Sequence, residues 1–309
     1  MRTIKFSLFS DLHHYPGVFR SQTPEHLWQI QRRAEEEKVD FIIHCGDLTH
    51  APHECQDFVG MYNDFHIPSY HCLGNHDTDG TPLEQTLRLY HMPDGHYYFD
   101  QNGFRMIVAD PNYYFHGGEY IHYDMGNYYP YGPYRDFMPP DQIDWLKGAI
   151  EGAPGPCLIF SHESFEREGN GVQNRALVRQ VINEANQKRP GSVLLCANGH
   201  YHRNALTILD NVAYFDVNSA SYDWLENAHD LYPEEETRAI RLLNHTVCYN
   251  DPIHAVVTVS EDGGIEIKGM ESSMLYGVRR EDTPNPRCDA DGRPVEPRVL
   301  SAKFRLIFD

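Results

Sequence analysis

The sequence lacks the cysteine spacing that a zinc ribbon or a disulfide framework needs. Its seven cysteines stand singly, and no two of them form a CxxC pair. Several, such as Cys45 and Cys196, lie in apolar runs, where a reduced cysteine behaves as a small buried hydrophobic residue. An odd number of scattered cysteines is typical of a reducing compartment. The pattern therefore predicts a protein without disulfides.

Long apolar runs are also missing. No stretch approaches the roughly 20 apolar residues that a transmembrane helix needs. The first residues, MRTIKFSLFSDLHH, contain one brief apolar segment and then polar groups, without the apolar core and cleavage site of a signal peptide. The sequence therefore predicts a soluble, cytoplasmic protein that does not interact with membranes.

Positive charge is scarce. The chain has 26 Lys and Arg against 45 Asp and Glu, a formal net charge of -19. Proteins that grip a nucleic-acid backbone present clustered Lys and Arg, so this balance argues against nucleic acid as the main partner. A small anionic substrate stays compatible with it, because bound divalent cations can reverse the local field.

The length and composition predict one globular domain with an extension. A chain of 309 residues with 40% hydrophobic residues can bury an extensive core. No internal repeat or low-complexity linker divides it, so we expect one domain over residues 1–270. Residues 112–138 are rich in Tyr and Gly without a clear period, which predicts an insert in that domain. Residues 271–309 form a C-terminal extension.

Strand-like and helix-like segments alternate through the first two thirds of the chain. Apolar strand patterns precede helical spacing several times, and residues 97–110 predict a hairpin with its turn at Asn102-Gly103. Thr81 and Glu84 predict a capping box at the start of a short helix. After Gly199 the sequence consists mainly of short strands. This order predicts a layered α/β (α+β) domain with a mixed sheet.

Polar side chains with metal-binding potential follow five of the predicted strands. In layered α/β folds, ligands bind beyond the carboxyl ends of the strands, so these side chains are expected to converge. They occur in SDLHH, CGDLTH, LGNHD, LIFSHE and LLCANGHYH. The candidate residues are Asp11, His13, Asp47, Asn75, His76, His162, His200 and His202.

The chemistry of this set indicates transition metals. Taken singly, each pattern is typical of a strand-end turn, a helix cap or a surface histidine. Together they offer carboxylate, amide and imidazole groups, which suit Mn, Fe, Zn or Ni better than the all-oxygen sites of Ca. The set is too large for one tetrahedral ion and suits two ions that share a bridging carboxylate.

The combined motifs resemble the signature of the calcineurin-like metallophosphoesterases. The resemblance covers residues 1–270. It implies a four-layer α/β/β/α sandwich of two mixed β-sheets flanked by helices, with two divalent or trivalent metal ions between the sheets. The motifs that carry it are Asp11-x-His13, Gly46-Asp47, Gly74-Asn75-His76-Asp77, His162 and Gly199-His200-x-His202.

The same resemblance assigns a role to each residue. It implies that His76 lies beside the phosphate and donates a proton. Beside these implied roles, we expect Asp77 either to accept a hydrogen bond from the His76 ring and orient it, or to have a structural role alone. The implied ligands are Asp11, His13 and His202 for one ion, Asn75, His162 and His200 for the other, and Asp47 as the bridge.

We therefore expect a metal-dependent phosphohydrolase that cleaves a small phosphomonoester or phosphodiester with a metal-activated water. The alternatives are a non-catalytic metal-binding or interaction module on the same fold, and a nuclease, which the acidic balance disfavours. The Tyr-rich insert is expected either to face the substrate or to cover the sheet edge. His14, His50 and His116 are expected to face solvent or to support the ligands.

Overall fold

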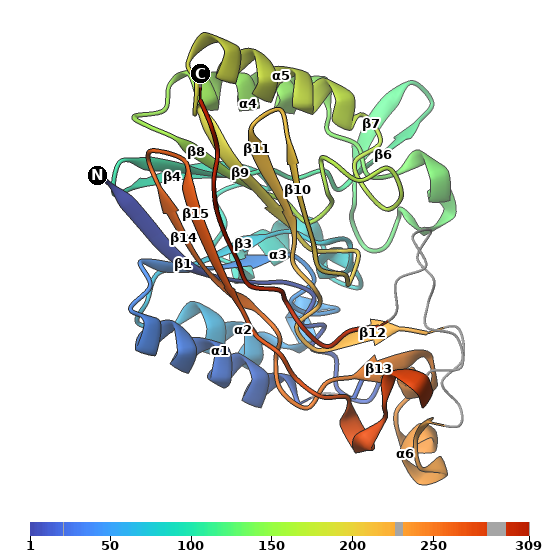
Figure 1. Ribbon diagram of the computed structural model, residues 1–309. Helices are drawn as coiled ribbons and strands as arrows, with labels where there is room; N and C mark the ends of the chain where they lie inside the picture. The colour runs from blue at the N-terminus through green and yellow to red at the C-terminus, as the bar shows by residue number, and fades with distance from the viewer. Residues whose placement is uncertain (21, 226–230, 283–294, 309) are drawn as a thin grey trace.

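Two β-sheets face one another across the centre of the molecule in this computed structural model (Figure 1). The structure describes residues 1–20, 22–225, 231–282 and 295–308, so Cys288 lies outside it. Helices cover the outer face of each sheet, which gives four layers in the order helix, sheet, sheet, helix (Figure 1). The prediction of an α/β/β/α sandwich is therefore confirmed.

The first sheet has the strand order β16-β15-β14-β1-β2-β3. Strands β1, β2 and β3 run parallel to one another. Strand β14 pairs with β1, β15 with β14 and β16 with β15, each antiparallel to its neighbour, so the sheet is mixed. The strands are β1 (Thr3–Phe9), β2 (Phe41–Cys45), β3 (Ser69–Cys72), β14 (Ala255–Ser260), β15 (Gly264–Gly269) and β16 (Ala302–Arg305).

The second sheet has the order β10-β11-β9-β8-β5-β4. Its four central strands are parallel, and the two edge strands are antiparallel to their neighbours. The strands are β4 (Tyr97–Gln101), β5 (Phe104–Val108), β8 (Cys157–Phe160), β9 (Val193–Asn198), β10 (Ala205–Leu209) and β11 (Val212–Asp216). The hairpin expected over residues 97–110 is present as β4 and β5.

Helices α1 and α2 cover the first sheet, and α4 and α5 cover the second (Figure 1). The short α3 follows the turn after β3, and α6 lies beside a small sheet of β12 (Tyr222–Trp224) and β13 (Thr246–Cys248). The helices are α1 (Thr23–Glu37), α2 (Gln56–Asn63), α3 (Leu83–Leu89), α4 (Pro140–Glu151), α5 (Arg175–Lys188) and α6 (Glu234–Ala239).

The side chains of β1 alternate between two hydrophobic cores, one between the sheets and one under helix α1. Successive side chains of a strand point to opposite faces. Phe6 and Leu8 therefore enter the core between the sheets, where Phe6 lies edge-on against Phe160 with ring centroids 5.5 Å apart. Phe9 faces the other way and packs with Leu27 of α1. Burial on both faces fixes the register of the strand, because a slip of one residue would exchange the two faces.

The C-terminal extension returns to the first sheet. Strand β16 pairs with β15, and the backbone N–H of Leu306 donates to the carbonyl of Gly263 at 2.9 Å. Leu306 is buried. The described part of residues 271–309 thus completes a sheet edge.

One local prediction is wrong. Helix α3 begins at Leu83 with Pro82 at its N-cap, and no side chain caps it. The hydroxyl of Thr81 lies instead 2.7 Å from Nδ1 of His53. The Thr81 hydroxyl therefore interacts with the His53 side chain and not, as the capping box had predicted, with the backbone of α3.

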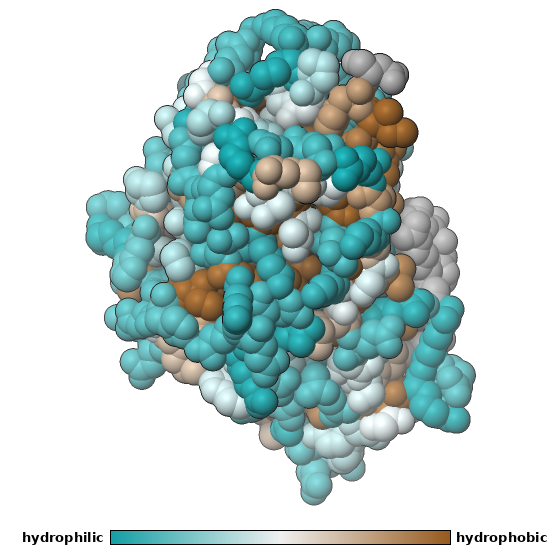
Figure 2. Space-filling view, turned by 60° about the vertical axis from the view of Figure 1, so that its left-hand side comes forward, coloured by the Kyte–Doolittle hydropathy of each residue, from teal (hydrophilic) through white to brown (hydrophobic). Residues whose placement is uncertain are grey.

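The surface seen in Figure 2 is mainly hydrophilic, as expected from a sequence without long apolar runs. Hydrophobic side chains lie on it in small separate areas. None of the helices that the structure describes is long and apolar enough to cross a bilayer. The cysteines of the described ranges are buried free thiols.

Candidate metal centre

The five polar clusters meet where the carboxyl ends of the two sheets come together. Strands β1, β2 and β3 are parallel neighbours in one sheet, and β8 and β9 are parallel neighbours in the other. Each cluster follows its strand directly, so the fold brings side chains from opposite ends of the chain to one place. The side chains form two groups.

The first group contains Asp11, His13 and His202, all of them buried. Oδ1 of Asp11 lies 3.3 Å from Nε2 of His202 and 3.7 Å from Nε2 of His13. The two Nε2 atoms lie 3.1 Å apart. Three candidate donor atoms thus face a common point.

The second group contains Asp47, His162 and His200. Oδ2 of Asp47 and Nδ1 of His200 each lie 3.2 Å from Nε2 of His162. The same Oδ2 lies 3.7 Å from Nε2 of His13 in the first group. Asp47 is therefore placed between the two groups, as a bridging carboxylate would be.

The donor atoms that face this space suit cations. The ring Nδ1 of His162 donates to the carbonyl of Cys45 at 2.7 Å, and that of His202 to the carbonyl of Tyr222 at 3.0 Å. A carbonyl only accepts, so Nδ1 carries a hydrogen in both rings and Nε2 is the atom that faces the centre. Burial by itself would lower the pKa of His162, but the charges of Asp47 and Asp11 outweigh this and raise it, so a cation would compete with a proton for its Nε2 atom. Within the described part of the chain, the buried Oδ1 atoms of Asp11 and Asn75 accept no hydrogen bond.

Burial also keeps two of the histidines neutral. It lowers the pKa of His13 to about 4 and that of His200 to about 3. Both rings are then uncharged at neutral pH, which is the form that binds metals. Neutral imidazoles, ionised carboxylates and unpartnered oxygens fit a pair of metal ions.

The backbone is unusual at this site. Five of the predicted ligands have φ between 51° and 67°, in the left-handed region that side chains other than Gly seldom adopt. Such conformations cluster at functional sites, where the surrounding structure holds them. The residues are Asp11, His13, Asp47, His200 and His202.

Two glycines permit the close approach of the ligands. A Cβ at Gly74 would overlap the Asp47 side chain, and a Cβ at Gly46, which has φ +91°, would overlap the His162 ring. The glycines beside the ligands are thus needed for space.

Gly74→Ala is expected to displace Asp47 and so to lower the metal content and the activity of the purified protein together. Elemental analysis and an assay of the activity expected from the sequence measure the two. Gly148→Ala is the matched control, because a Cβ at that position of α4 meets no atom within 4 Å. Unchanged metal content in Gly74→Ala would contradict this steric role.

His76 is held by Asp79. Its Nδ1 lies 2.7 Å from Oδ2 of Asp79. Burial by itself would lower the pKa of His76, but the charges of Asp47 and Asp79 outweigh this and raise it. The ring is therefore placed to carry a proton beside the two groups of ligands.

The predicted contact of Asp77 with the His76 ring is not formed, and this expectation is corrected. The Asp77 carboxylate accepts hydrogen bonds from the backbone N–H groups of Gly74, Asp47, Leu48 and Thr49 at 2.8–3.2 Å. Its other partner is the Tyr90 hydroxyl at 2.5 Å. Asp77 ties the loop after β2 to the loop after β3, which is the structural role left open from the sequence.

Sequence reasoning missed the groups that surround Asp79. The hydroxyls of Tyr128 and Tyr129 donate to its carboxylate at 3.1 and 2.6 Å, and Nδ2 of Asn75 donates to the Tyr128 oxygen at 3.1 Å. Tyr128 is buried and Tyr129 is exposed. The insert thus both packs against the sheet and reaches His76.

Two histidines outside the ligand set are buried as well. Nε2 of His50 lies 2.8 Å from Nδ1 of His13, and its ring stacks on His76 with centroids 4.2 Å apart. His14 stacks on Phe58 at 4.0 Å. His50 therefore supports a predicted ligand, whereas His116 is exposed.

The insert is attached to the sheet by an ion pair between the buried Asp110 and the partly buried His122. Its hairpin consists of β6 (Tyr113–His116) and β7 (Glu119–His122). Nε2 of His122 lies 2.6 Å from Oδ2 of Asp110, and its Nδ1 donates to the carbonyl of Tyr123 at 2.6 Å. Burial opposes both charges, but each group stabilises the other, so the pKa of His122 is raised and that of Asp110 lowered.

His122→Leu is expected to reduce the free energy of unfolding by about 3 kcal/mol, because it leaves a buried charge without its partner. A raised histidine pKa gives stability that is complete below about pH 6.5 and is lost as the pH rises through the folded-state value. Urea unfolding should therefore show a larger difference from the wild type at pH 6 than at pH 9. His116→Leu on the same hairpin is the control, and equal differences at both pH values would contradict the pair.

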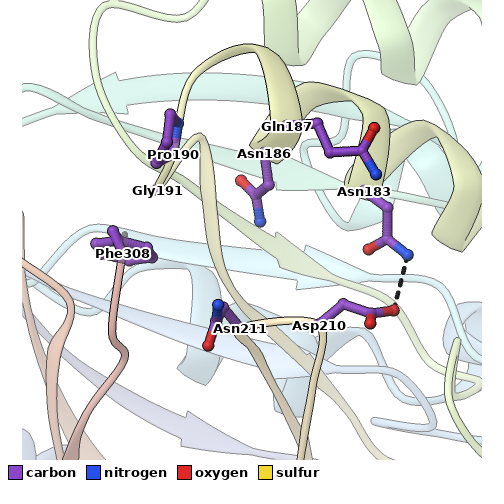
Figure 3. Close-up of a pocket in the computed structure, with 8 residues that line it drawn as sticks. All are labelled: Asn183, Asn186, Gln187, Pro190, Gly191, Asp210, Asn211 and Phe308. Atoms are coloured by element: carbon purple, nitrogen blue, oxygen red, sulfur yellow. Dashed lines mark hydrogen bonds between the residues drawn. The ribbon is translucent and has the colours of Figure 1, made fainter.

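Two hollows are relevant to where a ligand binds. One, of about 410 Å³, lies beside His76, His50 and Asp79. The other, of about 340 Å³, lies between α5 and the β10–β11 turn, where Nδ2 of Asn183 donates to Asp210 at 2.8 Å (Figure 3). None of the predicted site residues lines this second hollow.

Comparison with known proteins places the chain among phosphoesterases. The sequence model of the calcineurin-like phosphoesterase family matches residues 4–204, a range that contains all the predicted ligands. No curated protein sequence matches the chain.

Solved structures share the fold at low sequence identity. A dimetal phosphatase from Danio rerio is 12% identical with a TM-score of 0.58, and the match covers 90% of this chain and 100% of that one. GAP50, the anchor in the inner membrane complex of Plasmodium, is 14% identical with a TM-score of 0.53, and the match covers 91% of each chain.

Proposed function

The chain belongs to the calcineurin-like phosphoesterase family and is a hydrolase of phosphoester bonds, and on this premise we propose that it cleaves a small phosphomonoester or phosphodiester at a dinuclear metal centre. The observation that carries this proposal is the convergence of two groups of donor atoms around Asp47. Residues 1–270 would form the catalytic domain, with residues 112–138 as its insert and residues 271–309 as the extension. The free cysteine thiols support a cytoplasmic location.

Each ligand has a proposed place. Asp47 would touch both ions, since its Oδ2 faces both groups. The remaining ligands would be Asp11, His13 and His202 for one ion, and Asn75, His162 and His200 for the other. The mixture of carboxylate, amide and imidazole supports Mn, Fe, Zn or Ni.

The metal ions, when bound, supply positive charge that activates water and neutralises the phosphoryl oxygens. The chain's own contribution to the reaction is the proton on His76. Asp79 accepts a hydrogen bond from Nδ1 of that ring, so Nε2 is left to donate to the departing oxygen. Tyr128 and Tyr129 fix Asp79 in turn. Asp79 therefore replaces Asp77 as the group proposed to orient His76.

The test is hydrolysis of bis(p-nitrophenyl) phosphate by the purified protein with added manganese. We expect turnover that a chelator abolishes and that manganese restores. The metal-free protein should also unfold at a lower temperature than the loaded protein, since a ligand that binds the folded state stabilises it. No turnover with manganese, iron, zinc or nickel on any simple phosphate ester would contradict the proposal.

A non-catalytic module is the alternative that the fold itself permits, since one protein of the same fold is described as an anchor. The same assay distinguishes it: such a module would bind the metals and be stabilised by them without hydrolysing the ester. A nuclease remains disfavoured by the net charge of -19.

A further inference from the structure

We propose that the pocket beside His76 binds the organic group of the substrate, and that this group is a flat aromatic ring with a second negative charge, which Arg241 binds. This inference rests on the proposed function, because it concerns the leaving group of the same ester. The pocket has a volume of about 410 Å³, which is within the usual range for small-molecule sites.

Six separate segments of the chain line the pocket, and three of them supply its Tyr, Trp and Met side chains. The loop after β1 contributes Tyr15, the insert contributes Met125 and Tyr129, and the region of the small β12–β13 sheet contributes Trp224. Met125 and Tyr129 are 55% and 56% exposed. Large apolar side chains that remain open to solvent around a concave surface indicate a ligand-binding site.

The aromatic groups are ordered in a stack that leads to the proton donor. The ring of Tyr15 lies parallel to His50, at an angle of 5° and 5.8 Å between centroids. His50 in turn stacks on His76 at 4.2 Å. Trp224 stands edge-on to Phe19 at 5.8 Å. Flat side chains on the pocket walls favour a flat ligand, because aromatic rings gain from stacked and edge contacts with one another.

Arg241 is held at this pocket by its backbone. Its N–H donates to the carbonyl of Gly17 at 3.3 Å, and the next N–H, of Leu242, donates to the carbonyl of Val18 at 2.8 Å. The residue therefore stays against the loop that carries Tyr15.

The Arg241 side chain is exposed, and it forms no ion pair or hydrogen bond with any residue in the described ranges. Many arginines of this acidic chain are paired, although Arg179 is not within the part of the chain that the structure describes: Arg105 lies 2.8 Å from Asp100, and Arg167 lies 2.9 Å from Asp216. A guanidinium without a carboxylate partner can bind a carboxylate or phosphate of a ligand with two parallel hydrogen bonds.

Neither carboxylate that lines the pocket forms an ion pair with Arg241. Asp79 is engaged by Tyr128, Tyr129 and His76. The Glu54 carboxylate lies 3.8 Å from Nε2 of His53. Arg241 thus offers a positive charge at the pocket that is available to a ligand.

Three esters with similar leaving alcohols test the proposal: ethyl phosphate, 2-phenylethyl phosphate and 2-(4-carboxyphenyl)ethyl phosphate. We expect kcat/KM to rise in that order. Arg241→Gln should reduce the preference for the carboxylated ester over the phenylethyl ester by about tenfold or more, the usual effect of losing a charged hydrogen bond. Arg238→Gln is the matched control, since Arg238 lies on the neighbouring α6 and pairs with Glu234.

Calorimetry with 4-(2-hydroxyethyl)benzoate, the alcohol of the third ester, gives a readout that needs no turnover. We expect it to bind the wild type more tightly than Arg241→Gln. Binding through Arg241 without hydrolysis of any ester would contradict the proposed function and support the pocket assignment. Hydrolysis of all three esters with equal kcat/KM would overturn the pocket assignment and leave the function intact. If Arg241→Gln lowered kcat/KM equally for all three esters, the guanidinium would act on the reacting phosphate. This result would also overturn the assignment.

Discussion

Asp47→Asn should abolish phosphoesterase activity, lowering kcat by at least about 10³-fold, and should reduce the number of metal ions bound per chain. Asp47 is the carboxylate whose Oδ2 faces both groups of donor atoms, at 3.2 Å from Nε2 of His162 and 3.7 Å from Nε2 of His13. An amide has no negative charge with which to hold two cations at once. Elemental analysis and the ester assay together measure the effect.

The fold should survive this substitution, because Asn matches Asp in size and retains an oxygen for the backbone N–H of His76, which donates to Oδ1 at 2.8 Å. The circular dichroism spectrum is therefore expected to stay that of the wild type. Asp57→Asn, on the exposed side of α2, is the matched control for the loss of one charge. A fully loaded and active Asp47→Asn protein would exclude Asp47 as the bridge.

His76→Ala should have the second largest effect, with kcat lowered by about 10²–10⁴-fold, as is usual for the loss of a general acid. The metal content should not change, since His76 lies outside the two groups of ligands that face Asp47, although its ring, with His50 and Asp79, forms a third group of possible metal donors. The loss should be greater for an alkyl phosphate than for a nitrophenyl phosphate, because a nitrophenolate leaves without a proton.

Asp79→Asn should show the same dependence on the leaving group with a smaller loss, since it acts through His76. A purely structural role for Asp79 would lower kcat equally for both esters. His91→Ala is the control at an exposed histidine. If His76→Ala lost a metal ion, the ring would be a ligand and its role as proton donor would be excluded.

The site could be predicted from the sequence because each ligand follows an apolar strand directly. The periods of the strands place Asp11, Asp47 and Asn75 at the same edge of one sheet, and the composition of the set indicates metals. The strand pattern of the sequence does not predict how the strand ends of one sheet lie relative to those of the other sheet. That His162 meets Asp47 became evident from the family resemblance, and the distances of this structure show it.

The partner of His76 could not be predicted from sequence distance alone. The residues after Gly74 form a short 3-10 helix, Asn75–Thr78, in which residues three apart lie above one another. Asp79 therefore falls on the same side as His76, while Asp77 turns toward the backbone of the β2 loop. The sequence suggested a contact of His76 with the adjacent Asp77, and the geometry of the 3-10 helix makes this expectation wrong.

The Tyr-rich insert resisted prediction for a different reason. Its tyrosines have no period, so nothing in the sequence separates those that pack from those that face a ligand. Tyr123 and Tyr128 stack at 4.3 Å in the interior of the insert, whereas Tyr129 lines the pocket. Their hydrogen-bond partners, Asp136 for Tyr123 and Asp79 for Tyr128 and Tyr129, do not separate the two kinds either, because Asp79 binds one tyrosine of each kind.

The left-handed backbone of the five ligand residues has a consequence for protein engineering. Glycine would adopt the backbone angles of these positions without a steric penalty. Glycine at any of them would relieve this strain, but it would also remove a buried or partly buried side chain and its hydrogen bonds, such as the one that the Asp47 carboxylate accepts from the backbone N–H of His76. Such a substitution exchanges a gain in backbone energy for a cavity and a lost contact, so a designer of a durable scaffold should replace these residues with others of similar size.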